Sequence, residues 1–208
     1  MAHRSIARRP AVFLDKDGTL IEDRPFSPDG VTIHLLPGVP EGLQLLHRAG
    51  FLLIVVTNQH GVAQGRFTEE YVRHMEGSLR LILSTFQIPL SGFYYCPHHP
   101  AGTVKRYAVR CPCRKPNPGM LLRAAEDLHV SLDQSWMVGD ILHDVEAGRW
   151  AGCRTVLIEN GNETEWFMNE MRWPDYLADG MLRAARLIVD SSRSPSHRLS
   201  GSHGAQDE

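Results

Sequence analysis

Two aspartates near the start of the chain have the type and spacing needed for phosphoryl transfer. Asp15 and Asp17 lie two residues apart in Phe13-Leu-Asp-Lys-Asp-Gly-Thr-Leu20, directly after an apolar run. Alternate residues of an extended chain point to the same side, and Gly18 permits a tight turn behind them. One carboxylate can attack phosphorus and form an aspartyl phosphate, while the other protonates the leaving oxygen and later takes a proton from water. We expect Asp15 to be the nucleophile and Asp17 the acid/base.

A third aspartate suggests a metal. Asp140 stands in Val138-Gly-Asp-Ile-Leu-His-Asp144, after another apolar run. Three gathered carboxylates would raise one another's pKa values unless a cation neutralised them, and Mg²⁺ prefers oxygen ligands beside phosphate. Asp144, one helical turn further on, is expected to support the site from outside the ligand set. Alternatively, Asp140 is simply a helix N-cap and the Asp-x-Asp-Gly segment a solvated turn.

Cysteines and histidines cluster in the middle of the chain. Tyr95-Cys-Pro-His-His-Pro-Ala-Gly102 is followed by Arg110-Cys-Pro-Cys-Arg-Lys-Pro116. Three sulfurs and one imidazole suit tetrahedral Zn²⁺, and four protein ligands leave no open position, so this zinc would be structural. The expected ligands are Cys96, Cys111 and Cys113 with His98, or with His99 in its place. A disulfide or free thiols are the alternative.

Apolar runs alternating with amphipathic stretches must position these residues, and this pattern predicts a three-layer α/β/α fold with a Rossmann-like parallel sheet. The expected strands are residues 11–14, 51–56, 92–95, 135–138 and 155–158. The expected helices are residues 40–49, 68–86, 118–129, 143–151 and 178–189. Ligands bind at the carboxyl ends of such strands. The candidates at those ends are Asp15, Asp17, Thr57, Asn58 and Asp140.

Length and composition limit the other possibilities. A chain of 208 residues with 42% hydrophobic content can form one core, which we assign to residues 1–190, with a disordered tail at 191–208. The net charge of −2 argues against nucleic acid as a partner. The longest apolar run is too short for a membrane span, and Asp15 and Lys16 interrupt any signal-peptide core, so we expect a cytoplasmic protein.

Four motifs in fixed order carry a family resemblance. Asp-Lys-Asp-Gly-Thr, Val-Val-Thr-Asn-Gln, Arg-Lys-Pro and Val-Gly-Asp-x-x-x-Asp, spread over residues 12–158, resemble the haloacid dehalogenase superfamily phosphatases. The resemblance implies that Asp15, Asp140 and the backbone carbonyl of Asp17 hold Mg²⁺. It also implies that Thr57 and Lys115 contact the transferring phosphoryl oxygens, where fixed donors lower the barrier. Taken singly, these two would be a strand-end hydroxyl and a surface lysine.

The cysteine loop narrows the resemblance to the small phosphatases without a large cap domain that act on heptose 1,7-bisphosphate, with histidinol-phosphate phosphatases as relatives. This implies a phosphorylated sugar as substrate and His98 as the nitrogen ligand of zinc. The substrate pocket would comprise Asp23, Arg24, Pro25, Phe26, Asn58, Gln59, His60 and Arg114. The chain departs from the heptose enzymes at Ile141, where a lysine commonly follows the metal aspartate.

Other protein classes share parts of this pattern. Phospho-accepting receiver domains also combine acidic residues with a distant Thr and Lys, but their acceptor follows a different strand. A non-catalytic zinc module would give no reason for Asp15, Asp17 and Asp140 to gather. The net charge argues against a polynucleotide phosphatase of the same superfamily. We expect a monomeric enzyme.

Overall fold

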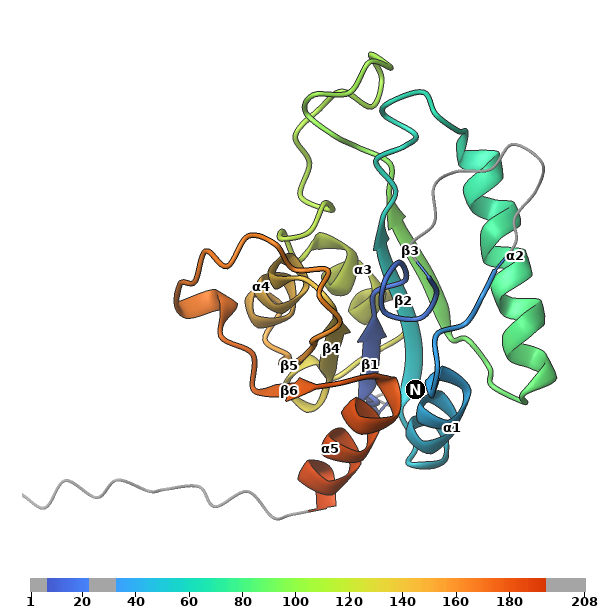
Figure 1. The fold of residues 1–208 in the computed structure, drawn as a ribbon, viewed down its shortest axis with the longest axis vertical. Coiled ribbons are helices and arrows are strands. Elements are labelled where there is room, and N and C mark those ends of the chain that lie inside the picture. The colour runs from blue at the N-terminus through green and yellow to red at the C-terminus, as the bar shows by residue number, and fades with distance from the viewer. Residues whose placement is uncertain (1–6, 23–32, 194–208) are drawn as a thin grey trace, which may run out of the picture.

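The computed structural model describes residues 7–22 and 33–193, which form one parallel sheet between two layers of helices (Figure 1). The strand order is β3-β2-β1-β4-β5-β6. The strands are β1 (Ala11–Leu14), β2 (Leu52–Asn58), β3 (Gly92–Cys96), β4 (Trp136–Gly139), β5 (Arg154–Ile158) and β6 (Tyr176–Ala178). The predicted α/β class and parallel sheet are confirmed, and no further domain is inserted between the elements within the described ranges.

Helices cover both faces of the sheet. The helices are α1 (Val39–Arg48), α2 (Glu69–Thr85), α3 (Gly119–Asp127), α4 (Leu142–Trp150) and α5 (Met181–Arg193). One core joins α1, α2 and α5 to the face that carries Val12 and Leu14. The other joins α3 and α4 to the face that carries Ala11 and Phe13. Because β1 is covered on both sides, all four of its residues are apolar and buried.

The C-terminal end of the fold differs from expectation. Residues 176–178 form the short edge strand β6, which was not predicted, and Ala178 pairs with Ile158 instead of beginning a helix. The last helix starts at Met181 and continues through Arg193, into the segment expected to be disordered. Serine side chains support these last residues, since Ser191 Oγ bonds the Tyr176 hydroxyl at 3.0 Å. The rest of the expected tail, 194–208, lies outside the described residues.

The topology brings the carboxyl ends of the two central strands, β1 and β4, together. From β1 the chain builds outward through β2 and β3, then returns to β4 on the other side of β1. The carboxyl ends of β1 and β4 thus form a topological switch point, where ligands bind in folds of this class. Among the described residues, no helix has the length and apolar character needed to cross a membrane.

Candidate active site

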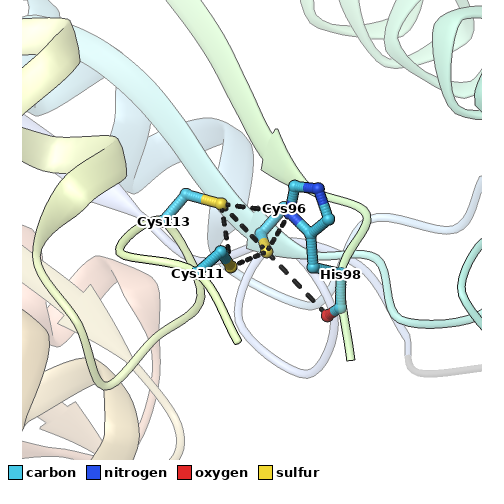
Figure 2. A group of neighbouring side chains, drawn as sticks. All are labelled: Cys96, His98, Cys111 and Cys113. Atoms are coloured by element: carbon cyan, nitrogen blue, oxygen red, sulfur yellow. Dashed lines mark hydrogen bonds between the residues drawn. The ribbon is translucent and has the colours of Figure 1, made fainter. Parts of the chain in front are cut away.

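A cluster of cysteine and histidine side chains closes the loop that follows β3 (Figure 2). Cys113 Sγ lies 3.1 Å from Cys111 Sγ, 3.3 Å from Cys96 Sγ and 3.4 Å from His98 Nδ1. These sulfur separations far exceed a disulfide bond of about 2.05 Å, and the four cysteines of the chain are free thiols. The disulfide alternative is therefore wrong, and the cluster is compatible with a zinc site.

The geometry also separates the two candidate histidines. His98 directs Nδ1 into the cluster, 3.7 Å from Cys96 Sγ. His99 Nδ1 instead accepts a hydrogen bond from the Ala101 backbone N–H at 3.1 Å. His98, and not His99, completes the four-residue group. Contacts with the neighbouring thiols Cys96 and Cys111 lower the pKa of Cys113 to about 5, although burial opposes this, so the cluster favours a thiolate.

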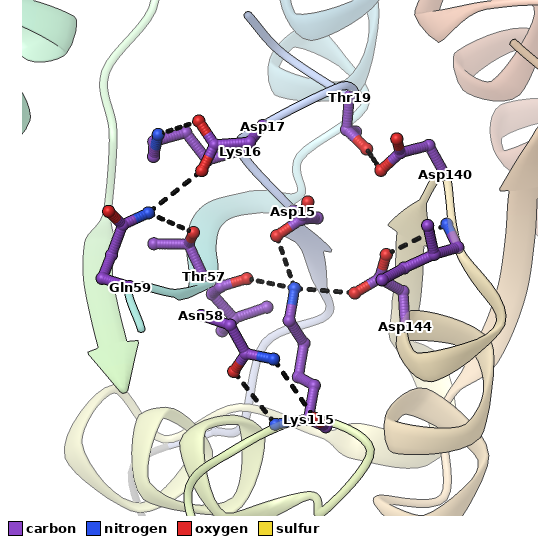
Figure 3. Close-up of polar contacts among 12 residues, drawn as sticks. Asp15, Lys16, Asp17, Thr19, Thr57, Asn58, Gln59, Lys115, Asp140 and Asp144 are labelled. Atoms are coloured by element: carbon purple, nitrogen blue, oxygen red, sulfur yellow. Dashed lines mark hydrogen bonds and ion pairs between the residues drawn. The ribbon is translucent and has the colours of Figure 1, made fainter. Parts of the chain in front are cut away.

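The cysteine loop leads directly to Lys115, whose ammonium lies at the centre of the acidic site (Figure 3). Lys115 is 2% exposed, forms ion pairs with Asp15 and with Asp144 Oδ1 (2.6 Å), and donates to the Val56 carbonyl at 3.0 Å. Asn58 fixes its backbone, because the Asn58 amide donates to the Lys115 carbonyl and accepts from its N–H, each at 3.1 Å. Asn58 and Lys115, which were expected to have separate roles, are thus joined by two hydrogen bonds. Asn58 was expected to line the substrate pocket, and a contact with substrate stays a prediction.

Asp140 brings a third carboxylate to the same place from the end of β4. One of its oxygens accepts from Thr19 Oγ1 at 2.9 Å, and the other from Asn162 Nδ2 at 2.6 Å. Carboxylate oxygens of Asp15, Asp140 and Asp144 lie within 4.8 Å of one another, and all three residues are buried. Asp144 therefore belongs to the cluster itself, where the sequence had suggested only a supporting place.

Two glycines allow this crowding. A Cβ on Gly18 would lie 2.1 Å from Asp140 Oδ2, and Gly18 also has a φ of +77°. A Cβ on Gly139 would lie 2.2 Å from Asp144 Oδ2. Any residue with a side chain at position 18 or 139 would collide with the neighbouring carboxylate, so both glycines are needed for the acidic groups to converge.

The charges at the site strongly perturb one another. Burial raises the pKa of Asp15, Lys115 opposes that shift, and the carboxylates of Asp144, Asp140 and Asp17 add to it, to about 8 in all. Burial alone would lower the pKa of Lys115, but Asp144 and Asp15 raise it above its ordinary value. The ammonium of Lys115 therefore stays charged, but this single positive charge is too little to stabilise all the neighbouring carboxylates in their ionised form.

Asp17 lies nearer to solvent, with its side chain 32% exposed. It forms an ion pair with the buried Lys16 and accepts from Gln59 Nε2 at 3.0 Å. The same nitrogen lies 2.9 Å from Thr57 Oγ1. Gln59, expected among the pocket residues, thus joins Asp17 to Thr57 at the mouth of the site.

The other expected substrate residues are only partly described. Arg114 Nη1 lies 3.4 Å from the His98 carbonyl, so the cysteine loop holds its guanidinium. Burial lowers the pKa of His60, and the Arg114 charge lowers it further. The segment from Asp23 to Phe26 lies outside the described residues.

One set of residues at the site was not predicted from the sequence. Beyond β5, the Asn160 amide donates to the Gly18 carbonyl at 2.6 Å, and Asn162 binds Asp140. Glu163 Oε2 accepts from the Leu142 backbone N–H at 2.6 Å, at the start of α4. The only signal in the sequence is a polar run after a strand, which is typical of any loop.

The fold and the acidic switch-point site define a hydrolase of the haloacid dehalogenase class, and a family model described as HAD-hydrolase-like matches residues 112–184. Over 171 residues the chain is 39% identical to D-glycero-beta-D-manno-heptose-1,7-bisphosphate 7-phosphatase of Escherichia coli K12, covering 78% of this chain and 90% of that protein. The Pasteurella multocida enzyme of the same name is 40% identical over 154 residues, which cover 74% of this chain and 83% of the relative. The chain therefore belongs to the heptose bisphosphate phosphatase family of HAD-like hydrolases, and it is a phosphoric monoester hydrolase.

Solved structures agree with this assignment. A HAD-like phosphatase from Mesorhizobium loti superposes with a TM-score of 0.77 at 30% identity, covering 95% of this chain and 94% of the other. D,D-heptose 1,7-bisphosphate phosphatase from B. bronchiseptica, complexed with magnesium and phosphate, superposes with a TM-score of 0.72 at 26% identity, covering 88% and 99%. The fold is therefore shared with these two phosphatases over 88% or more of this chain.

Proposed function

We propose that this protein removes the 7-phosphate from D-glycero-D-manno-heptose 1,7-bisphosphate in a magnesium-dependent reaction with Asp15 as nucleophile. The observation that carries the proposal is the buried group of Asp15, Lys115, Asp140 and Asp144 at the switch point. The substrate is supported by relatives 39% identical over most of the chain that are named for this reaction. Histidinol phosphate is the competing substrate.

The first half-reaction begins at Asp15. An oxygen of its carboxylate forms a bond to phosphorus while the bond from phosphorus to the sugar oxygen breaks, which yields an aspartyl phosphate. Asp17 gives its proton to the departing sugar oxygen. Its partly exposed side chain suits this role because the leaving group faces the mouth of the site, while Asp15 lies deeper.

The second half-reaction reuses Asp17. A water molecule gives its proton to the Asp17 carboxylate as its oxygen bonds to phosphorus, and the bond from phosphorus to Asp15 breaks. Inorganic phosphate leaves, and both aspartates return to their starting states. Gln59 holds Asp17 and Thr57 in a fixed relation through one nitrogen, at 3.0 and 2.9 Å. Thr57 and Lys115 can then donate to the phosphoryl oxygens as their charge increases.

The acidic group fits a divalent cation. Asp15, Asp140 and the Asp17 carbonyl would hold Mg²⁺, with Asp144 close enough to contribute through a water or directly. The pKa of about 8 at Asp15 supports this assignment, because it reflects a buried carboxylate with further carboxylates beside it, which a cation would stabilise. When bound, Mg²⁺ neutralises the phosphate and the attacking carboxylate and aligns the phosphoryl group for in-line transfer.

The cysteine cluster fits zinc in a structural role. Cys96, His98, Cys111 and Cys113 supply a complete tetrahedral set, and closely approaching thiols without disulfides are typical of such sites. Zinc would stabilise a loop with few apolar residues of its own. It would thereby position Arg114, whose planar guanidinium can bind the second phosphate or the sugar through two parallel hydrogen bonds.

Phosphate release is the direct test. The purified protein would be assayed with Mg²⁺ against both anomers of heptose 1,7-bisphosphate and against histidinol phosphate, with Asp15→Asn as the blank. We expect preference for a heptose bisphosphate, and dependence on both Mg²⁺ and Asp15. Preference for histidinol phosphate would refute the proposed substrate but would leave the proposed mechanism unaffected. A cytoplasmic location, a monomeric state and the absence of nucleic-acid binding stay predictions.

A further inference from the structure

The loop after β5 lies across two separate parts of the active site. This loop, residues 159–163, follows β5 and approaches both the turn after β1 and the turn after β4. Asn160 Nδ2 donates to the Gly18 carbonyl, and Asn162 Nδ2 donates to Asp140 Oδ2, each at 2.6 Å. Through these two hydrogen bonds the loop links the turn at Gly18 to Asp140, two positions that are far apart in the chain.

The contact of Asn162 with Asp140 orients a carboxylate that has little other freedom. Asp140 is 3% exposed, and its second oxygen accepts from Thr19 at 2.9 Å. Each carboxylate oxygen offers two lone pairs, so these two donors fix the plane of the group while leaving lone pairs for a cation. Packing is close as well, because a Cβ on Gly18 would lie 2.4 Å from Asn162 Nδ2.

The same loop also holds the backbone beyond Asp140. Helix α4 begins without a side-chain cap from its own N-cap residue, Ile141. Glu163 supplies an acceptor instead, since its Oε2 lies 2.6 Å from the Leu142 N–H. A carboxylate at a helix N-terminus is also favoured by the helix dipole. Loop and helix start thus fix the position of Asp140 from both sides.

We infer that Asn162 is a positioning residue for the magnesium site, holding Asp140 in its ligating orientation, with Asn160 and Glu163 fixing the loop that carries it. This inference rests on the proposed magnesium-dependent function. Loss of a group that orients a metal ligand typically lowers metal affinity 10- to 100-fold. We expect Asn162→Ala to lower Mg²⁺ affinity by about 10- to 100-fold. The kcat at saturating Mg²⁺ should fall much less.

The experiment measures Mg²⁺ binding by titration calorimetry, without substrate, for wild type, Asn162→Ala and Asn162→Leu. Leucine keeps the approximate volume of asparagine but has no donor, so it separates hydrogen bonding from packing. Asn169→Ala is the matched control: it removes an asparagine from the same connection between β5 and β6, and the side chain of Asn169 accepts a local hydrogen bond from the Met171 N–H at 2.8 Å. Melting temperatures of the metal-free proteins report whether each variant is folded.

The outcomes separate the two proposals. Weaker Mg²⁺ binding in both Asn162 variants, with Asn169→Ala like wild type, is the expected result. Wild-type affinity in Asn162→Leu, or equal weakening in Asn169→Ala, would overturn the positioning role. Absence of Mg²⁺ binding by the wild type would overturn the proposed magnesium site itself. If Asn162→Ala melts far below wild type, Asn162→Leu decides the question, since its exposed position tolerates the change.

Discussion

Replacing Lys115 with methionine tests the electrostatic design of the site. The side chain is 2% exposed and lies between Asp15 and Asp144, the latter fully buried. Methionine keeps most of the apolar volume but leaves two buried carboxylates without their cation. Removing one partner of a buried ion pair costs about 3–5 kcal/mol. In a protein of this size, about 1 kcal/mol shifts the melting temperature by roughly 2–4 °C, so the metal-free variant should melt about 6–20 °C lower.

The assay is thermal and denaturant unfolding without Mg²⁺, combined with a double-mutant cycle. Asp144→Asn removes the other side of the pair, so the double variant should cost less than the two single variants together, by about 0.5–3 kcal/mol. Arg123→Met is the matched control, because Arg123 pairs with Asp127 at 3.6 Å on an exposed helix face. Such a surface pair contributes about 0.3–0.5 kcal/mol. Additive costs, or a Lys115 variant as stable as the control, would refute the reasoning.

Three further predictions concern the turn, the pH dependence and the cysteine cluster. Gly18→Ala should abolish Mg²⁺-dependent phosphate release, because the new Cβ would collide with Asp140. Gly50→Ala is the control: Gly50 has a φ of +94° and no atom within 4 Å of the new Cβ, so this variant should retain activity and cost only backbone strain of about 1–2 kcal/mol. Equal losses of activity in both variants would argue against the steric explanation. Because the pKa of Asp15 is about 8 when folded and 3.8 ordinarily, the folded metal-free protein holds a proton that the unfolded chain lacks, and its stability should fall as pH rises through that interval. Saturating Mg²⁺ should therefore raise the melting temperature more at pH 8.5 than at pH 6, and Asp15→Asn should flatten this difference. Cys113→Ser should lower the zinc content, measured by elemental analysis, and the melting temperature. Cys153→Ser, which changes a buried thiol with a pKa of about 12, should keep its zinc. Wild-type protein purified without zinc would contradict the structural role.

The central strands could be predicted because their sequence is apolar on both faces. β1 and β4 are buried along their whole length, and an apolar run of only four residues is too short for a buried helix and fits a strand covered on both sides. The ends were less certain, since β2 continues through the polar Thr57 and Asn58, which pair with Tyr95 and Cys96. Pairing with a neighbouring strand decides such residues, and it does not follow from local composition.

The edge strand β6 shows where local reasoning fails. It has three residues, and its central Leu177 is 50% exposed. Neither alternation nor a long apolar run can appear over so short a span. The strand forms because the outer side of β5 has free backbone hydrogen-bonding groups, and residues 176–178 pair with them, Ala178 opposite Ile158. That edge is a property of the assembled sheet.

Site residues divide in the same way. The convergence of Asp15 and Asp140 could be predicted because both follow buried strands of a parallel sheet, and the structure brings their carboxylates together. The roles of Thr57 and Lys115 at the site were expected only through the family resemblance. Asn160 and Asn162 could not be predicted, because an amide in a polar loop has no pattern that indicates its partner. Their contacts depend on the path of the loop back over the sheet, which only the three-dimensional fold specifies.

The charge balance of the buried group explains why these residues need a cation of a particular valence. Asp15, Asp140 and Asp144 carry three negative charges when ionised, and Lys115 carries one positive charge, which leaves a formal charge of −2. Asp17 and Lys16 form a separate ion pair with no net formal charge, although the Asp17 carboxylate still raises the pKa of Asp15. One divalent ion neutralises the remainder, whereas a monovalent ion would leave a buried negative charge. Burial raises the pKa of Asp15 most, and the neighbouring carboxylates add to that shift, so a proton and the proposed Mg²⁺ compete for the same carboxylate group.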